Sequence, residues 1–310
     1  VPEHQLTGHS GSVSAVSTAT LDGRSVAVSA SDDGSIRSWD IITGQPIGNP
    51  ITGHSNYVVS VTTTTLDGRP VIISGSDDST IRIWDLATHT QIGPDLTGHT
   101  GSVLALTTTQ LDGRPVIISG GADYTVRVWD PTTHTQIGAE IPGHTDWVRA
   151  VSVAQLDDRP VIISASDDKT LRAWDLTTHA PIGDAFTGHT DWVRGLATTE
   201  LDGRPVAISG SDDDTVRIWD IATGDQIGST LTGHTDWVRA ITTIQLNGRP
   251  VIISASDDES LRVWDLATGA QLARLTGHTD YIYAVTATEV NARPVVVSSG
   301  ADTTVRTWDL

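Results

Sequence analysis

The chain has 310 residues, with 38 acidic against 19 basic residues, a net charge of −19 and no cysteine. This charge argues against the phosphate-neutralising surface that nucleic-acid binding needs, and the lack of cysteine excludes disulfides, thiolate metal sites and cysteine nucleophiles. No apolar run approaches the ~18 residues that span a bilayer. We therefore expect a cytoplasmic protein with neither nucleic acid nor membrane as partner. The sequence leaves the oligomeric state open, with a monomer as the expectation. Because Val1 stands where an initiator methionine would, we also expect a fragment or a trimmed chain.

Two dipeptides recur along the whole chain. Gly-His and Trp-Asp each occur seven times, and each histidine precedes its tryptophan by 30 residues. The repeat is 45 residues long, except that the sixth copy loses one residue. No linker or composition shift interrupts the series, which predicts one domain over residues 1–310. The copies begin near Gly8, Gly53, Gly98, Gly143, Gly188, Gly233 and Gly277.

Each copy contains four short segments of strand-like sequence, as the second copy shows. Val58–Thr62 is β-branched and apolar, and Leu66–Arg69 contains Asp-Gly, a strong signal for a tight hairpin. Val71–Gly75 is apolar throughout, which predicts a strand buried on both faces. Thr80–Trp84 is the third expected strand and Gln91–Leu96 a weaker fourth. Without helical periodicity anywhere, seven four-stranded antiparallel units predict an all-β, seven-bladed propeller.

The repeat resembles the WD40-repeat β-propeller family, in which Gly-His is followed after about 30 residues by Trp-Asp, with Ser-Asp-Asp between them. The resemblance implies that Val1–Leu6 adds the outer strand of the last blade, which stops at Leu310 after its third strand. Such closure makes a ring without two open edges. The Leu-Asp-Gly-Arg-Pro-Val hairpins are similar to those of bacterial, actinobacterial-type arrays appended to multidomain signalling proteins.

A serine, a histidine and an aspartate recur at fixed spacing in every copy, which could indicate a hydrolase. In WD40 proteins a similar set forms a buried chain in which tryptophan donates to serine, serine to histidine and histidine to aspartate. We call these residues the tetrads, and the resemblance implies that they are structural. They are His9, Ser29, Asp33, Trp39; His54, Ser74, Asp78, Trp84; His99, Ser119, Asp123, Trp129; His144, Ser164, Asp168, Trp174; His189, Ser209, Asp213, Trp219; His234, Ser254, Asp258, Trp264; and His278, Ser298, Asp302, Trp308.

Catalysis would need an exposed serine oxygen, an oxyanion hole and a histidine free to move protons. Seven equal copies leave no sequence for a specificity pocket, so we expect no enzyme and no catalytic residue. His89, His134 and His179 occupy one turn in three adjacent copies, and such turns are expected too far apart to share a metal ion. We expect them to be polar turn residues, and we expect neither a metal nor a cofactor.

The copies differ at positions that face ligands on the top side of WD40 relatives. Two of these positions follow each Gly-His, and a third precedes the tetrad aspartate. Copies four to six share Thr-Asp-Trp-Val-Arg, and tryptophan and arginine are enriched at binding hot spots. The resulting candidate partner-binding residues are Tyr57, Trp147, Arg149, Trp192, Arg194, Trp237, Arg239, Tyr281 and Tyr283.

The leading hypothesis is a non-enzymatic interaction scaffold or sensor module that binds a protein or peptide carrying a carboxylate, a phosphate or an aromatic side chain. An alternative is an engineered or recently amplified propeller with no specific ligand, in which Asp167, Asp212 and Asp257 pair with the arginines and cancel their charge. A more remote alternative is a small-ligand binder or hydrolase in the central channel.

Overall fold

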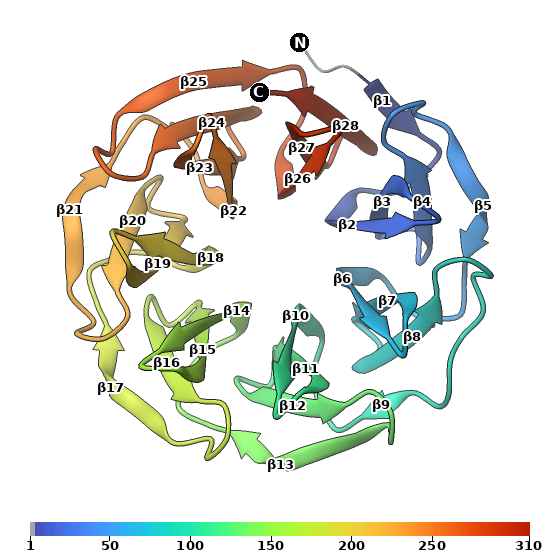
Figure 1. Ribbon diagram of the computed structural model, residues 1–310, viewed down its shortest axis with the longest axis horizontal. Coiled ribbons are helices and arrows are strands. Elements are labelled where there is room, and N and C mark those ends of the chain that lie inside the picture. Colours follow the sequence, from blue (N-terminus) through green and yellow to red (C-terminus); the bar gives the residue numbers. More distant parts are fainter. Residues whose placement is uncertain (1–3) are drawn as a thin grey trace.

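Seven antiparallel sheets of four strands each form a closed ring in the computed structural model, which describes residues 4–310. Within six of the sheets the strands follow chain order, and Figure 1 shows the first strand of each blade nearest the centre and the last on the circumference. The prediction of an all-β, seven-bladed propeller is confirmed. Over the same residues, no helix is long and apolar enough to cross a membrane.

The strands have the following bounds, grouped by blade. They are β2 (Val13–Leu21), β3 (Arg24–Ser31), β4 (Ile36–Asp40) and β5 (Pro46–Ile51); β6 (Val58–Leu66), β7 (Arg69–Ser76), β8 (Thr80–Asp85) and β9 (Leu96–Thr97); β10 (Val103–Leu111), β11 (Arg114–Gly121), β12 (Val126–Asp130) and β13 (Thr135–Ile141); β14 (Val148–Leu156), β15 (Arg159–Ser166), β16 (Leu171–Asp175) and β17 (Pro181–Phe186); β18 (Val193–Leu201), β19 (Arg204–Ser211), β20 (Val216–Asp220) and β21 (Gln226–Leu231); β22 (Val238–Leu246), β23 (Arg249–Ser256), β24 (Ser260–Asp265) and β25 (Gln271–Thr276); and β26 (Ile282–Val290), β27 (Arg293–Gly300), β28 (Thr304–Asp309) and β1 (His4–Thr7).

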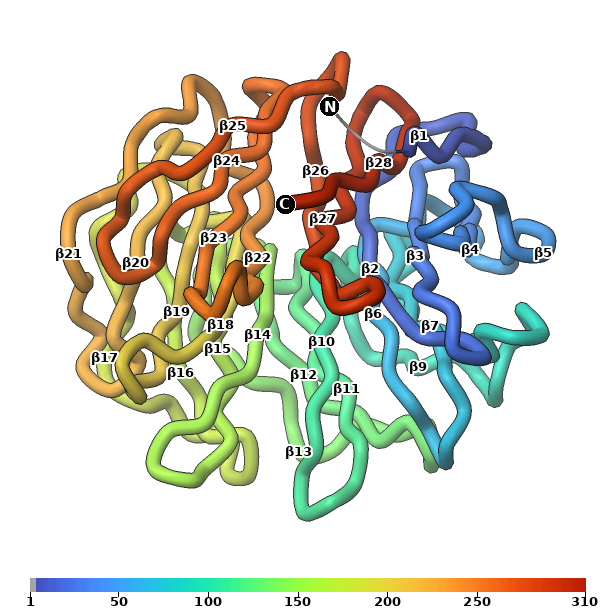
Figure 2. The backbone as a smooth tube through the Cα atoms, turned by 45° about the horizontal axis from the view of Figure 1, so that its top comes forward, coloured from blue at the N-terminus to red at the C-terminus, as the bar shows by residue number. Residues whose placement is uncertain are grey.

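The two ends of the chain meet in the last blade. Strand β1 pairs antiparallel with β28, with His4 opposite Thr307 and Thr7 opposite Thr304. Figures 1 and 2 both show these two strands side by side. The expected closure is confirmed. The first three residues of the predicted closing segment, Val1–Glu3, lie outside the described residues. The pairing covers the outer edge that blade seven would otherwise expose.

The hairpin and the second strand of each blade follow from local sequence. In blade two, Asp67 and Gly68 have φ of 49° and 77°, as a two-residue hairpin with both central residues at positive φ requires. Beyond them, the segment from Val71 to Ser76 is buried at every position. The predictions of a tight turn and a strand buried on both faces are therefore confirmed.

Two predicted strand bounds in blade two differ from the structure. The first strand extends beyond Thr62 to Leu66 because the hairpin register continues to the turn. The fourth strand is shorter than Gln91–Leu96, since only β9 and an isolated bridge from Gln91 to Trp84 are present. Between them Gly93 has a φ of 67°, and Pro94 has no N–H to donate to the ladder.

The hydrophobic core is divided among the gaps between blades. One cluster contains Val26 and Ile36 of blade one together with Val58, Ile72 and Trp84 of blade two. Six further clusters combine neighbouring blades in the same way. Each tetrad tryptophan thus packs against the preceding blade while its indole N–H remains available to its own blade.

Candidate functional site

The tetrads form the same hydrogen-bonded chain in all seven blades. In blade four, Trp174 Nε1–H donates to Ser164 Oγ over 2.8 Å, the serine hydroxyl lies 2.8 Å from His144 Nε2, and His144 Nδ1 lies 2.7 Å from Asp168 Oδ2. In the other six blades the corresponding distances are 2.8–2.9, 2.7–2.8 and 2.8–2.9 Å. Since the serine oxygen accepts from the indole, its own proton is donated to the histidine.

Burial and hydrogen bonding set the charge state of the tetrads. Burial lowers the pKa of His54 and His189, although their aspartate partners oppose that change. Burial opposes ionisation of Asp33, but hydrogen bonds from Ser35, the Ser10 N–H and His9 outweigh it and lower the pKa of Asp33 to about 2. At neutral pH the tetrads of His54 and His189 therefore contain a neutral imidazole that donates to a carboxylate.

This geometry disfavours catalysis at the tetrad serines. Ser164 is fully buried, and both its oxygen and its proton are committed to neighbours in the tetrad. A nucleophile needs an approach path for its substrate, and none reaches a side chain with no exposed surface. We interpret the tetrads as supports that join each Gly-His loop to the second and third strands of its blade.

The variable residues of blades four to seven form a continuous stack at the top of the ring. The Arg149 guanidinium carbon lies 4.4 Å from the ring centroid of Trp147 and 5.9 Å from that of Trp192. Arg194 lies between Trp192 and Trp237, at 4.9 and 5.3 Å. Arg239 lies 4.7 Å from Trp237 and 5.5 Å from Tyr283, which ends the stack. We call these residues the rim ladder: Trp147, Arg149, Trp192, Arg194, Trp237, Arg239 and Tyr283.

Each ladder arginine is paired with a buried aspartate. Asp167 receives Arg149 Nε and Nη2 at 2.8–3.0 Å, and Asp257 receives Arg239 at 2.7–3.0 Å. Arg194 Nε donates to Asp212 over 2.6 Å. Burial raises the pKa of Asp212 and Asp257, and the arginine hydrogen bonds oppose that rise. The three pairs cancel much of the arginine charge, the alternative left open from the sequence.

The second variable position of every blade lines the mouth of the central channel. A cavity of about 310 Å³ there is bounded by these seven side chains together with Asp32. Arg149, Arg194, Arg239 and Tyr283 form one side, and Ser14, Val59 and Leu104 the other. The mouth is thus polar and aromatic over blades four to seven and small or aliphatic over blades one to three.

Large aromatic side chains stand exposed beside this mouth. Trp147, Trp192 and Trp237 are 40%, 37% and 39% exposed, and Tyr57 and Tyr281 are more so. The aspartate before each tryptophan fixes the loop, because its Oδ1 accepts the tryptophan backbone N–H at 2.8–3.0 Å. Among the described residues, Tyr57 and Tyr281 take no part in the ladder stacking, so the structure unites seven of the nine candidate residues.

The histidines expected to be simple turn residues connect neighbouring blades. His89 Nδ1 lies 2.8 Å from the Asn49 carbonyl oxygen, and its ring lies against Gly48 of the preceding blade. His134 and His179 make equivalent contacts. Sequence reasoning missed this role. The available signal was that each histidine follows a glycine by 41 residues, at Gly48, Gly93 and Gly138.

Comparison with known proteins agrees with this architecture. The profile of the family described as WD40, "WD domain, G-beta repeat", matches residues 1–40, 44–85, 90–130, 135–175, 181–220, 225–265 and 269–309. The crystal structure of the WD40 beta propeller domain of Doa1 is similar at a TM-score of 0.81 and 27% identity, covering 99% of this chain and 95% of that one. No curated protein sequence matches the chain. Seven matched repeats over seven blades show that the chain belongs to the WD40-repeat family.

Proposed function

We propose that this propeller is a non-enzymatic scaffold or sensor module that binds a peptide or a loop of a partner protein across the rim ladder. WD40 propellers are commonly protein-interaction scaffolds. The observation that carries the proposal is the set of three adjacent, partly exposed tryptophans interleaved with arginines on one side of the channel mouth. Exposed tryptophan and arginine are the residues most enriched in binding hot spots.

The ladder is held rigid before any partner binds. Each tryptophan is stacked on a guanidinium, and each guanidinium is fixed by a buried carboxylate. Side chains already ordered in the free protein lose little conformational entropy on binding. This preorganisation supports recognition of extended chains by the ladder, with flat side chains stacking on the tryptophans.

The charge around the ladder favours a basic or apolar partner segment over an acidic one. The arginines face buried aspartates, whereas Asp191, beside Trp192, has 49% of its side chain exposed and lies 3.7 Å from Lys169 Nζ. The chain as a whole carries a net charge of −19. Within residues 4–310, Nη1 of Arg149, Arg194 and Arg239 donates to no protein atom, and these groups can donate to carbonyls of a bound chain.

The similarity of the hairpin repeats to bacterial signalling arrays supports the finer part of the proposal. According to this finer proposal, the propeller is a monomeric, cytoplasmic sensor module of a larger bacterial signalling protein. Binding at the ladder would then report the presence of the partner to the rest of that protein.

Selection from a random peptide display library tests the ladder directly. Peptides enriched on the wild-type propeller are measured again on a Trp147→Ser, Trp192→Ser, Trp237→Ser variant. We expect enriched peptides to contain lysine or arginine with aromatic residues, and the variant to lose at least about tenfold in affinity, or 1.4 kcal/mol.

Tyr124→Ser is the matched control, because Tyr124 is 44% exposed and lies outside the ladder. It should bind the peptides like the wild type. Circular dichroism melts establish whether all three proteins are folded. If no peptide is enriched, or if the triple variant binds as tightly as the wild type, the ladder is a copied repeat consensus and the proposal fails.

A further inference from the structure

The outer surface of the ring has a groove between neighbouring blades that the chain usually fills with one ring-shaped side chain. Between blades one and two, an added Cβ at Gly48 would lie 2.8 Å from the imidazole of His89. Between blades three and four, Gly138 lies equally close to His179, whose Nδ1 is 3.2 Å from the Ala139 carbonyl oxygen. The groove thus combines a flat glycine floor with one carbonyl acceptor.

One further interface uses the same arrangement, whereas two others place a ring of the outer strand against the glycine of the turn, Gly44 or Gly224. His134 Nδ1 lies 3.1 Å from the Pro94 carbonyl oxygen between blades two and three. His4 Nε2 lies 2.9 Å from the Ile42 carbonyl oxygen where blade seven meets blade one. Between blades four and five, the phenyl ring of Phe186 lies against Gly224. Five interfaces therefore hold a planar ring from the chain itself.

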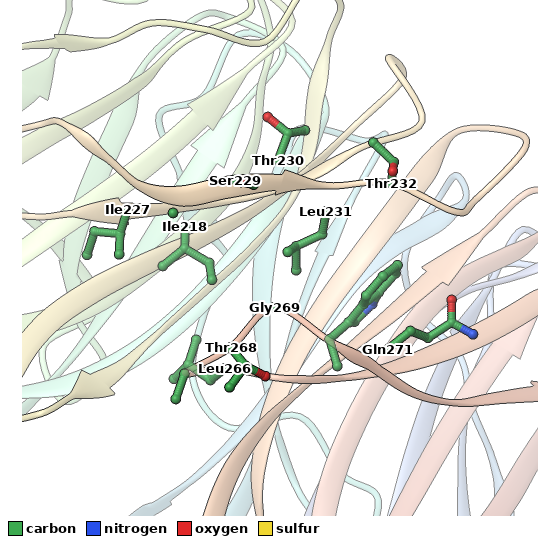
Figure 3. A pocket seen from close by; sticks show the side chains of 13 residues that line it. Ile218, Ile227, Ser229, Thr230, Leu231, Thr232, Leu266, Thr268, Gly269 and Gln271 are labelled. Atoms are coloured by element: carbon green, nitrogen blue, oxygen red, sulfur yellow. The ribbon is translucent and has the colours of Figure 1, made fainter.

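The interface between blades five and six has no such ring among the described residues. The position of the turn histidine is Gly269, and that of Phe186 is Leu231. An added Cβ at Gly228 would meet nothing within 4 Å, as at Gly183 between blades four and five. Here, however, no ring lies against the turn glycine either, because the side chain near Gly269 is Leu231, whose Cδ2 would lie 2.8 Å from an added Cβ. The result is a cavity of about 310 Å³ bounded by Ile218, Ile227, Gly228, Ser229, Thr230, Leu231, Thr232, Trp264, Leu266, Ala267, Thr268, Gly269 and Gln271 (Figure 3). We call it the open groove.

The backbone of the open groove matches that of the filled grooves. Gly269 has a φ of 71°, close to the 60° of His89 and the 63° of His179. Ser229 follows Gly228 as Asn49 follows Gly48, so its carbonyl stands at the position of the histidine acceptor. Figure 3 shows Ile227 and Leu231 on one side and Leu266 and Thr268 on the other. The chain therefore displays in its own filled grooves the chemistry that fits the open one.

We propose that the open groove binds the histidine side chain of a partner polypeptide, with the imidazole on Gly228 and its N–H donating to the Ser229 carbonyl. None of the residues that bound the groove carries a charge, which favours the neutral imidazole over the imidazolium. The open groove lies on the circumference of the ring, whereas the rim ladder lies at the channel mouth. Neither proposal therefore depends on the other.

Backbone amide NMR of the labelled protein, titrated with N-acetylhistidine amide, tests the site. We expect saturable shifts of the Gly228, Ser229 and Gly269 amides in the millimolar range. N-acetylalanine amide should bind at least about tenfold more weakly, because it has no ring to fill the groove and no imidazole N–H.

Two variants compare a filled groove with an open one. Gly269→His supplies the ring from within and should abolish the shifts, whereas Tyr124→Ser, at an exposed residue outside the groove, should keep them. Leu231→Phe narrows the same groove from the outer strand and should weaken the shifts, so the test does not depend on one variant folding. The proposal is overturned if the wild type shows no localised shifts, or if they persist unchanged in both Gly269→His and Leu231→Phe.

Discussion

Blades one to three and blades four to six have the same interior but different outer features. The hydrogen-bond distances in their tetrads agree to within 0.2 Å. For example, the distances His54–Asp78 and His234–Asp258 are both 2.8 Å. At the channel mouth, however, the first three blades present Ser14, Val59 and Leu104, and the next three present arginines. On the circumference, histidines fill grooves up to blade four, and the open groove follows blade five.

The difference separates what holds the ring together from what can recognise a partner. The buried contacts repeat because each blade must pack against the next with the same geometry. The rim and circumference can vary because a change there disturbs only a few contacts. Changes to the tetrads should therefore affect the two halves equally, and changes to the rim should not.

Acid should produce the largest loss of stability, and it should act on both halves. The pKa values of His9, His54, His189 and His234 are lowered by burial from 6.5, so the unfolded chain binds protons more readily near that pH. The free energy of unfolding that these neutral histidines contribute is fully present above pH 6.5. It falls as the pH drops below that value, by at most about 1.4 kcal/mol per pH unit for each histidine. Protonation of Asp33 and Asp78, from pH 3.8 down to about 2, adds a further loss.

Urea midpoints measured between pH 8 and pH 4 check this expectation. His54→Gln and His234→Gln, one in each half, should reduce the pH dependence by the same amount. A midpoint that is constant or rises as the pH falls would show that the tetrad histidines are protonated in the folded state.

Removing a ladder arginine should cause the next largest loss of stability. This loss is expected only in blades four to six, because only they carry the ladder arginines. Arg239→Ala leaves the buried Asp257 carboxylate without its partner, which should cost about 3–5 kcal/mol in the free energy of unfolding. Leu104→Ala, at the same position in blade three, removes apolar contacts only and should cost less. The double change Arg239→Ala, Asp257→Ala should recover part of the loss, and a double variant as unstable as the single one would contradict the pairing.

Tetrad serines should matter moderately and equally in both halves. Ser74→Ala and Ser209→Ala each leave an indole N–H and an imidazole nitrogen unsatisfied, at about 1–3 kcal/mol for each buried group. Denaturant unfolding measures both variants under the same conditions. Values that differ by more than about 1 kcal/mol would show that the matching bonds are not energetically equivalent.

The smallest expected effect is a gain in stability from a change in blade seven, which belongs to neither of the two compared groups of blades. Ala292 occupies the second turn position of its hairpin at a φ of 59°, which favours glycine. Ala292→Gly should therefore stabilise the protein by about 1 kcal/mol, and Gly68→Ala should destabilise blade two by a similar amount. Thermal melts measure both, and peptide binding at the rim ladder should not change with either.

The sequence predicted features that repeat at a fixed period much better than contacts between repeats. The tetrads recur every 45 residues in six of the copies, so their positions could be read directly. The pairing of Arg149 with Asp167 stayed an open alternative, because side-chain orientation is not encoded in spacing. The contact of His89 with Gly48 was missed because it crosses between blades, and the break at Pro94 because it occurs in one copy only.

The pairing of β1 with β28 has a consequence for folding during synthesis. His4 meets Thr307, about 300 residues later in the chain, so β1 lacks its partner until translation has nearly passed blade seven. At about 5–20 residues per second, this delay is roughly 15–60 s. During that time β1 and the open side of blade one are exposed to other chains. Ring closure is therefore the last folding event of this propeller, and its timing is set by the ribosome.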